Sequence, residues 1–247
     1  MLLKKKTAII TGCNRGIGEK ILEKFSSSGA NIFACTRKKN SEFESKISEL
    51  ARKYKVKIIP IYFDFADSEE IKSAAKRILD SGEAIDILVN NAGIIDVSIY
   101  QMTSIKKLKD MFEINFFSQT IFTQNIIKSM IKNKSGSIIN LASITALDGN
   151  EGRSAYAASK SALIAQMKTL SKEVGIFNIR VNCIAPGLID TEMLSKSTPK
   201  NIIENMKNKI SLRRVGNPEE IADVALFLSS SLSTYISGQV IRVDGGM

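Results

Sequence analysis

The chain alternates from end to end between short apolar runs and longer stretches with helical periodicity. Runs with the length and composition of strands lie at 6–11, 31–35, 56–63, 85–89, 137–141, 178–184 and 239–243. Strands this apolar are typical of a parallel sheet, because helices cover both of its faces. No linker rich in Pro, Gly or Ser interrupts the alternation. The sequence therefore predicts one α/β domain over 1–247, built on a doubly wound, seven-stranded parallel sheet flanked by helices.

One of the predicted helices is unusually long, running from about 106 to 133. Its apolar residues occupy more than one narrow stripe, so we expect it to bury two faces. One face would pack on the sheet, and the other would either contact a second subunit or deepen the core. A helix that ends near Ser81 is predicted to begin after Asp67, with Asp67 as N-cap and Glu70 completing a capping box.

Three glycines cluster between the first strand and the first helix, in the segment 11–18. Their spacing is Gly-x-x-x-Gly-x-Gly, whereas the common dinucleotide-binding pattern is Gly-x-Gly-x-x-Gly. Both patterns allow a tight turn and bring the amides at a helix N-terminus close to a pyrophosphate. Glycines that serve only as turn residues are the alternative. Because they stand where a doubly wound sheet binds ligands, we predict a Rossmann-type dinucleotide site.

The loop after the second strand bears on the choice of dinucleotide. An NAD site usually offers a carboxylate to the ribose hydroxyls at this point. Here the order is Cys35-Thr36-Arg37-Lys38-Lys39, which contains no acid. Arg37 together with Arg15 is suited to hold a 2′-phosphate, since guanidinium groups bind phosphate in a bidentate manner. We therefore predict NADP(H), with an ordinary basic surface loop as the alternative.

Tyr156 and Lys160 are separated by one helical turn in a chain that contains no histidine. Side chains at i and i+4 share a helix face, so the phenol and the ammonium can approach each other. A cation near a tyrosine favours the phenolate and lowers the tyrosine pKa from its usual value of about 10. A solvated helix face would carry such a pair by chance. Since Ser-His-Asp and Cys-His chemistry is excluded, the pair is predicted to be the acid–base apparatus.

Composition excludes several other classes of protein. The net charge is +10, but the lysines are spread along the chain, so we expect no nucleic-acid binding. Cys13, Cys35 and Cys183 are far apart and predict neither a metal site nor a disulfide framework. No apolar run approaches the ~20 residues of a membrane span, and no signal peptide is evident. We therefore expect a cytoplasmic protein without metal or membrane.

Taken in order, these features resemble the short-chain dehydrogenase/reductase family, and within it the 3-oxoacyl-[acyl-carrier-protein] reductase group. The resemblance covers essentially the whole chain. Its motifs are the loop 11–18, Asp64, Asn90–Gly93, Asn115, Ser143, Tyr156, Lys160, Pro186-Gly187 and Asp244-Gly245-Gly246.

The resemblance implies a role for each of four catalytic residues. Tyr156 would donate a proton to the substrate carbonyl, and Ser143 would hydrogen-bond the developing alkoxide. Lys160 would bind the nicotinamide ribose and lower the pKa of Tyr156. Asn115 would hold a water that links Lys160 to solvent. As alternatives, Ser143 would only cap the turn after its strand, and Asn115 would only satisfy a backbone group at a bend in its helix.

It also implies a set of cofactor contacts and no metal. Asp64 would contact the adenine unless it is only a turn or cap residue, and Thr191 would reach the carboxamide or the phosphates. The implied contacts are Gly12, Asn14, Arg15, Gly16, Ile17, Gly18, Arg37, Asp64, Phe65, Asn91, Ala92, Gly93, Tyr156, Lys160, Pro186, Gly187, Ile189 and Thr191.

The implied reaction is NADPH-dependent reduction of a 3-oxoacyl thioester on acyl carrier protein, by a homo-oligomer that is commonly a tetramer. The family places a substrate lid at about 188–215, which here carries six basic residues against three acids. This face would dock an acidic carrier protein, or it is only a solvated lid. Phe177 stands near a position where carrier-protein reductases often have arginine, although Lys134 could supply charge nearby. Reduction of a sugar, polyol or other small carbonyl compound is therefore the main alternative, followed by a non-catalytic nucleotide-binding protein.

Overall fold

Seven parallel strands form one sheet in the computed structural model, which describes residues 1–247. The strands are β1 (Thr7–Thr11), β2 (Asn31–Thr36), β3 (Ile58–Tyr62), β4 (Ile87–Asn90), β5 (Gly136–Leu141), β6 (Ile179–Pro186) and β7 (Val240–Val243). Their order across the sheet is β3-β2-β1-β4-β5-β6-β7. The order reverses between β1 and β4, which is where a doubly wound sheet opens its ligand crevice. The predicted α/β architecture is confirmed.

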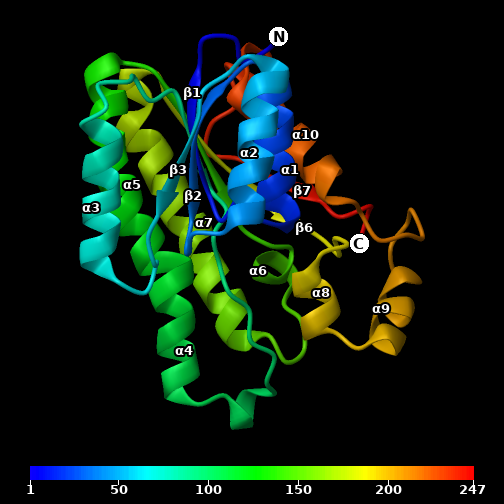
Figure 1. Cartoon of the computed structure of the whole chain (residues 1–247). Coiled ribbons are helices and arrows are strands. Elements are labelled where there is room, and N and C mark those ends of the chain that lie inside the picture. The colour runs from blue at the N-terminus through cyan, green and yellow to red at the C-terminus, as the bar shows by residue number, and fades with distance from the viewer.

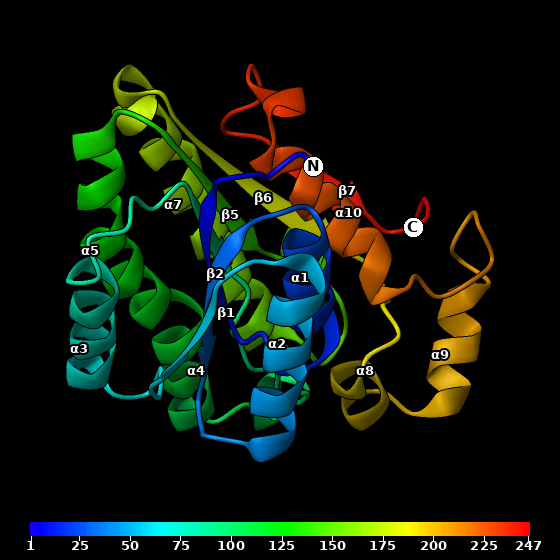
Figure 2. The same ribbon diagram turned by 45° about the horizontal axis from the view of Figure 1, so that its top comes forward.

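Helices cover both faces of the sheet (Figures 1 and 2). On one face lie α1 (Gly16–Ser27), α2 (Ser41–Tyr54) and α10 (Pro218–Ser229), and on the other α3 (Ser68–Leu79), α5 (Ser118–Asn133) and α7 (Ser154–Val174). Alternate residues of β1 enter different cores, since Ile9 packs on one side while Ala8 and Ile10 pack on the other. Two buried faces explain why the centre of β1 is apolar at successive positions.

Shorter elements lie mainly beyond the carboxyl ends of the strands. They are the 3₁₀ turn Tyr100–Met102, α4 (Ile105–Phe112), α6 (Thr145–Asp148), the 3₁₀ turn Gly175–Phe177, α8 (Glu192–Ser197), α9 (Lys200–Lys207) and the 3₁₀ turn Ser231–Ser233. In Figure 1, α8 and α9 stand to one side of the sheet and α4 below it. None of the helices has the length and apolarity needed to cross a bilayer.

The long helix expected over 106–133 is interrupted. A π-helical turn, Glu113–Phe117, separates α4 from α5, and Asn115 within it is completely buried. A π turn accommodates an extra residue, and such turns are frequent at functional sites. The sequence predicted the span of this helix but not the type of its break.

The N-terminus of α3 differs from its prediction in one detail. Asp67 does cap the helix, because its Oδ1 accepts hydrogen bonds from Glu69 N–H and Glu70 N–H at 2.8 and 3.1 Å. The Glu70 carboxylate does not complete a capping box; it accepts from Asp64 N–H at 2.7 Å. The reason is that Asp67 N–H already donates to the Asp64 carbonyl at 3.1 Å.

Candidate active site

The glycine loop closes tightly over the end of β1. Gly12 and Gly16 adopt left-handed φ values of +65° and +56°. A Cβ on Gly18 would lie 2.2 Å from the Gly12 carbonyl oxygen, so no other residue fits there. Arg15 is the N-cap of α1, and its side chain makes no capping hydrogen bond. Peptide N–H groups at the start of α1 are thus free of a side-chain cap, which fits an anionic pyrophosphate.

Asn91 braces this loop from the neighbouring strand. Its Nδ2 donates to the carbonyls of Thr11 and Gly12 at 2.9 and 3.0 Å. In return, Thr11 Oγ1 accepts from the backbone N–H groups of Asn91 and Ala92, both at 3.0 Å. Four hydrogen bonds therefore join the loop to the segment after β4 on one wall of the crevice.

Tyr156, Lys160 and Ser143 are brought together at the same edge of the sheet. Tyr156 is 9% and Lys160 3% exposed, and the Lys160 Nζ lies 6.0 Å from the Tyr156 ring centroid. The Lys160 Nζ donates to the Leu141 carbonyl at 2.6 Å, at the end of β5. Burial lowers the pKa of Lys160 to about 8.

The electrostatics of the phenol differ from the sequence expectation. Burial raises the pKa of Tyr156 above its usual value, while a hydrogen bond with the Ser143 hydroxyl and the positive charge of Arg153 act to lower it. Arg153 is thus a second cation near the phenol, in addition to the Lys160 ammonium at 6.0 Å from the ring centroid. A residue one turn before Tyr156 on a helix could have been singled out by spacing, but Arg153 was missed.

Asn115 joins the segment after β4 to α7, the helix that carries Tyr156 and Lys160. Its Oδ1 accepts from Ile94 N–H at 2.8 Å, and its Nδ2 donates to the Ile94 carbonyl at 2.9 Å and to Ser159 Oγ at 3.2 Å. Ser159 Oγ in turn donates to the Tyr156 carbonyl at 2.8 Å. The alternative predicted for Asn115, a backbone partner at a helix bend, is what the structure contains. Its role in holding water stays a prediction.

Ser143 has a structural contact as well as its effect on the pKa of the phenol. Its Oγ accepts from Thr145 N–H at 3.2 Å, at the start of α6.

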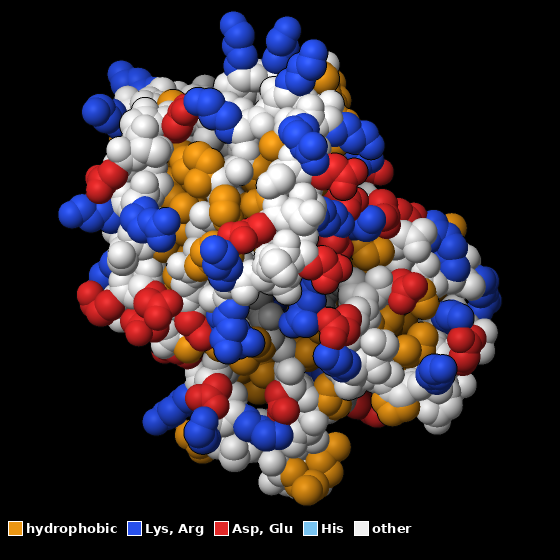
Figure 3. Space-filling view, viewed as in Figure 1, with side chains coloured by type: hydrophobic (Ala, Val, Ile, Leu, Met, Phe, Trp, Pro, Cys, Tyr) orange, Lys and Arg blue, Asp and Glu red, His pale blue; other side chains and the backbone are white.

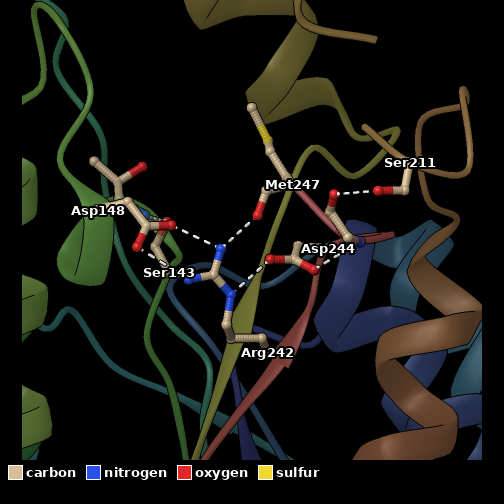
Figure 4. Close-up of polar contacts among 8 residues, drawn as sticks. Ser143, Asp148, Ser211, Arg242, Asp244 and Met247 are labelled. Carbon is tan, nitrogen blue, oxygen red and sulfur yellow. Dashed lines mark hydrogen bonds and ion pairs between the residues drawn. The ribbon is translucent and has the colours of Figure 1, made fainter. Parts of the chain in front are cut away.

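Arg242 joins the end of α6, at Asp148, to the C-terminus of the chain (Figure 4). Arg242 donates to Asp148 Oδ1 at 3.0 Å, to Asp244 Oδ2 at 2.8 Å and to the Met247 carbonyl at 2.8 Å. Nothing in the sequence pattern marked Arg242, because its partners lie on separate segments.

The segment after β6 faces the glycine loop. A Cβ on Gly16 would lie 3.5 Å from Thr191 Cγ2, and Thr191 Oγ1 caps α8 by accepting from Leu194 N–H at 3.3 Å. Gly187 packs so closely on Asp244 that a Cβ would lie 2.7 Å from its Cα. Pro186 ends β6, and Ile189 is buried.

The remaining predicted cofactor contacts differ from one another in exposure and in the partners of their side chains. Arg15 was expected to hold a 2′-phosphate together with Arg37, but its guanidinium forms an ion pair with Glu192 of α8 at 2.7 Å. Arg37 is exposed after β2. Asp64 forms a turn by accepting from Ala66 N–H at 2.9 Å. The ring of Phe65 packs on those of Phe63 and Phe122, and its carbonyl accepts a hydrogen bond from Ser118 Oγ. Asn14 is exposed and Ile17 half-buried in the loop.

Comparison with known proteins identifies the family. Residues 12–247 match the family model described as "Enoyl-(Acyl carrier protein) reductase". The chain is 41% identical to the 3-oxoacyl-[acyl-carrier-protein] reductase FabG of Chlamydia muridarum, covering 100% of this chain and 98% of that protein. The chain belongs to the short-chain dehydrogenase/reductase family. As a member it is an oxidoreductase that uses a nicotinamide cofactor.

Solved structures of other short-chain dehydrogenase/reductases share its whole fold. A mutant of the Serratia marcescens short-chain dehydrogenase/reductase superposes with a TM-score of 0.92 at 29% identity, covering 100% of this chain and 99% of that one. A 7α-hydroxysteroid dehydrogenase complexed with NADH and 7-oxo glycochenodeoxycholic acid gives a TM-score of 0.92 at 31% identity, covering 99% and 94%.

Proposed function

We propose that this short-chain dehydrogenase/reductase reduces the 3-oxo group of an acyl thioester, carried on acyl carrier protein, to a 3-hydroxyl group with NADPH. The observation that carries the proposal is the buried Tyr156 phenol, whose pKa the Ser143 hydroxyl acts to lower, one helical turn from the buried Lys160 at the crevice edge. The similarity to 3-oxoacyl-[acyl-carrier-protein] reductases over the full chain supports the acyl substrate. The description of the matching family model names an enoyl reductase. Reduction of a 3-oxoacyl thioester and reduction of an enoyl thioester must therefore be compared directly.

Four residues of the chain have separate roles in the reduction of the carbonyl. Tyr156 donates its phenolic proton to the carbonyl oxygen, and burial keeps that proton in place at neutral pH by raising the phenol pKa. Ser143 donates a hydrogen bond to the same oxygen as negative charge develops on it. Lys160 orients the nicotinamide ribose, and its lowered pKa lets the amine pass a proton onward. Asn115 holds a water on this route.

The residues present fit a nicotinamide dinucleotide. The left-handed Gly12 and Gly16, the uncapped start of α1 and Thr191 opposite them form a cradle for the pyrophosphate. When bound, the dinucleotide supplies the hydride. Arg37, with no carboxylate beside it, favours the 2′-phosphate of NADPH, and Arg15 joins it if its pair with Glu192 opens.

The lid offers limited support for a carrier protein. Residues 188–215 are proposed as the lid of a single catalytic domain, and three of their basic side chains are neutralised: Lys196 by Glu192, Lys207 by Glu204 and Arg214 by Glu220. Lys200, Lys209 and Arg213 remain for an acidic partner. Figure 3 shows basic and acidic side chains interspersed over the middle and lower parts of that face.

A small carbonyl substrate is the second candidate, and one observation favours it. Where carrier-protein reductases often place arginine, Phe177 packs against the core and the neighbouring Ile176 is 82% exposed. An acidic protein surface gains no charge partner there. A steroid or sugar ketone would not need one.

The deciding experiment is NADPH oxidation by the purified chain on a panel of carbonyl substrates. We expect acetoacetyl carrier protein and acetoacetyl pantetheine to react faster than keto-sugars, a 7-oxo steroid or a crotonyl thioester. Tyr156→Phe should lower turnover by about 100-fold or more while NADPH still binds. Turnover of the enoyl substrate alone, or undiminished turnover by Tyr156→Phe, would refute the proposal.

We also place this enzyme in the cytoplasm as a homotetramer. Its three cysteines are all free and buried, which suits a reducing compartment. Phe117, at the π turn between α4 and α5, is 49% exposed beside the rings of Phe112 and Phe116. An exposed aromatic cluster of this kind favours burial against a second subunit.

A further inference from the structure

Arg153 lies at the junction of three walls of the substrate crevice. It immediately precedes α7, one turn before Tyr156, and its charge acts on the phenol. Its Nη2 donates to Thr198 Oγ1 at 2.7 Å, and Thr198 lies between the lid helices α8 and α9. The carbonyl of the preceding Gly152 accepts from Ser98 N–H at 2.8 Å, which brings the segment after β4 alongside.

The Arg153 guanidinium is half-buried and has no carboxylate partner. Other arginines around the crevice are paired: Arg15 with Glu192, Arg214 with Glu220, and Arg242 with Asp148 and Asp244. Burial lowers the pKa of Arg153, and only the negative charge of a Tyr156 phenolate acts against it. A guanidinium has five N–H donors, and the only side chain bonded to this one is Thr198. A charge withdrawn from water normally gains an acceptor, so the substrate is the natural source of one.

A 3-oxoacyl thioester carries a second oxygen, on C1, one methylene away from the reacting ketone. With the C3 oxygen held by Tyr156 and Ser143, the C1 oxygen lies on a neighbouring side of the crevice. We propose that Arg153 is a substrate-binding residue whose guanidinium donates to the C1 carbonyl oxygen, while Thr198 of the lid holds it in that direction. This inference rests on the proposed function and adds a reason for selecting 1,3-dicarbonyl compounds over isolated ketones.

The arrangement also couples the lid to the substrate. Thr198 is 6% exposed, so its contact with Arg153 exists only while the segment between α8 and α9 is packed down. Moving the lid away releases the guanidinium from its one side-chain partner. Substrate held by Arg153 therefore favours the packed lid, and a ketone lacking the C1 oxygen does not.

A purely structural role, in which Arg153 only ties the lid to α7, predicts a different outcome. In that case its loss disturbs every substrate alike, through lid position or through the phenol. The two roles are separated by a matched pair of substrates: acetoacetyl pantetheine and its 3-oxobutyl thioether, in which the C1 carbonyl is replaced by a methylene. The quantity to compare is the ratio of kcat/KM for the thioester to kcat/KM for the thioether.

We expect Arg153→Gln to lower this ratio by about tenfold or more, the usual effect of losing one charge-assisted hydrogen bond. Arg153→Lys should retain part of the ratio, and Thr198→Val should lower it to a smaller extent. Arg77→Gln, a change at an exposed arginine on α3, is the matched control and should leave it unchanged. NADPH affinity and melting temperature report whether each variant is folded.

A ratio within about twofold of the wild-type value in folded Arg153→Gln would overturn the assignment. If Arg153→Gln does not fold, Arg153→Lys and Thr198→Val decide in the same way. Failure of the proposed function itself looks different, because the wild-type enzyme would then leave the thioester unreduced.

Discussion

The side-chain amide of Asn115 closes a ring of two hydrogen bonds on the backbone of Ile94. Its Oδ1 accepts from Ile94 N–H at 2.8 Å and its Nδ2 donates to the Ile94 carbonyl at 2.9 Å, as one strand partner does to another. Gly93, which precedes Ile94, lies close to both Asn115 and Lys160: a Cβ there would be 3.0 Å from Asn115 Oδ1 and 3.5 Å from Lys160 Nζ. The π turn that carries Asn115 therefore sets the distance between the wall after β4 and the buried lysine.

Replacing Asn115 with alanine should destabilise the fold as well as slow catalysis. The change leaves the N–H and carbonyl of Ile94 without their partners, which costs about 1–3 kcal/mol in the free energy of unfolding. Urea denaturation measures it. Asn125→Ala on α5 is the control, because Asn125 only donates to the Ile121 carbonyl of its own helix. Equal stability of the two variants would mean that the amide of Asn115 is not structural.

Alanine at Gly18 should weaken both dinucleotide binding and stability. An alanine inside a helix is normally favourable relative to glycine, but here its Cβ would lie 2.2 Å from the Gly12 carbonyl oxygen and 2.4 Å from Asn91 Nδ2. Overpacking of this kind costs about 1–3 kcal/mol. Gly175→Ala, whose Cβ would meet nothing within 4 Å, should be neutral or stabilising. Calorimetric titration with NADPH and thermal melting of the pair test this contrast.

Stability should depend on pH through Lys160. Its pKa is about 8 in the folded chain against 10.5 when exposed. Below pH 8 both states hold the proton and the full cost of burying the ammonium is present. Between the two values the unfolded state binds more protons, so this residue makes the free energy of unfolding rise with pH.

Unfolding of the ligand-free protein from pH 7 to pH 10 measures that rise, and Lys160→Met should remove it. Lys168→Met changes an exposed lysine on the same helix and should preserve it. A rise of the same size in Lys160→Met would contradict the lowered pKa.

Arg37→Asp should shift cofactor preference from NADPH toward NADH. An aspartate repels the 2′-phosphate and accepts from the free ribose hydroxyls, and losing an arginine–phosphate contact alone costs about 10- to 100-fold in relative affinity. Equilibrium titration with both dinucleotides gives the ratio. Arg52→Asp, at an exposed position on α2, controls for the change in net charge. If wild-type protein already prefers NADH, the assignment of Arg37 is wrong.

Phe117→Glu should break the assembly into smaller species. The wild-type chain is 27.1 kDa, and we expect sedimentation of a species of four chains at micromolar concentration. A carboxylate within the ring cluster of Phe112, Phe116 and Phe117 could not be buried without a large cost in desolvation. Ile176→Glu, at an equally apolar but 82% exposed position, should leave the mass unchanged. A wild-type species of one chain would refute the tetramer.

The sequence by itself determined the sheet, its parallel strands and the place of its crevice. Strands buried on both faces are mostly apolar at successive positions, so β1 and β4 could be recognised as continuous apolar runs. The glycines of 12–18 were equally recognisable in the sequence, because a left-handed φ at Gly12 and Gly16 favours glycine and the lack of space at Gly18 requires it. Both features, the apolar run and the glycine spacing, involve residues close together along the chain, and the sequence shows these directly.

Only the tertiary structure decided how the side chains of the site are partnered. It inserted a π turn at Asn115, paired Arg15 with Glu192, and bonded Arg153 to Thr198. It also buried Tyr156 deeply enough to raise its pKa, where spacing alone suggested a lowered one. The physical reason is the same in each case: burial and hydrogen bonding depend on segments distant along the chain, and their balance exists only once those segments pack together.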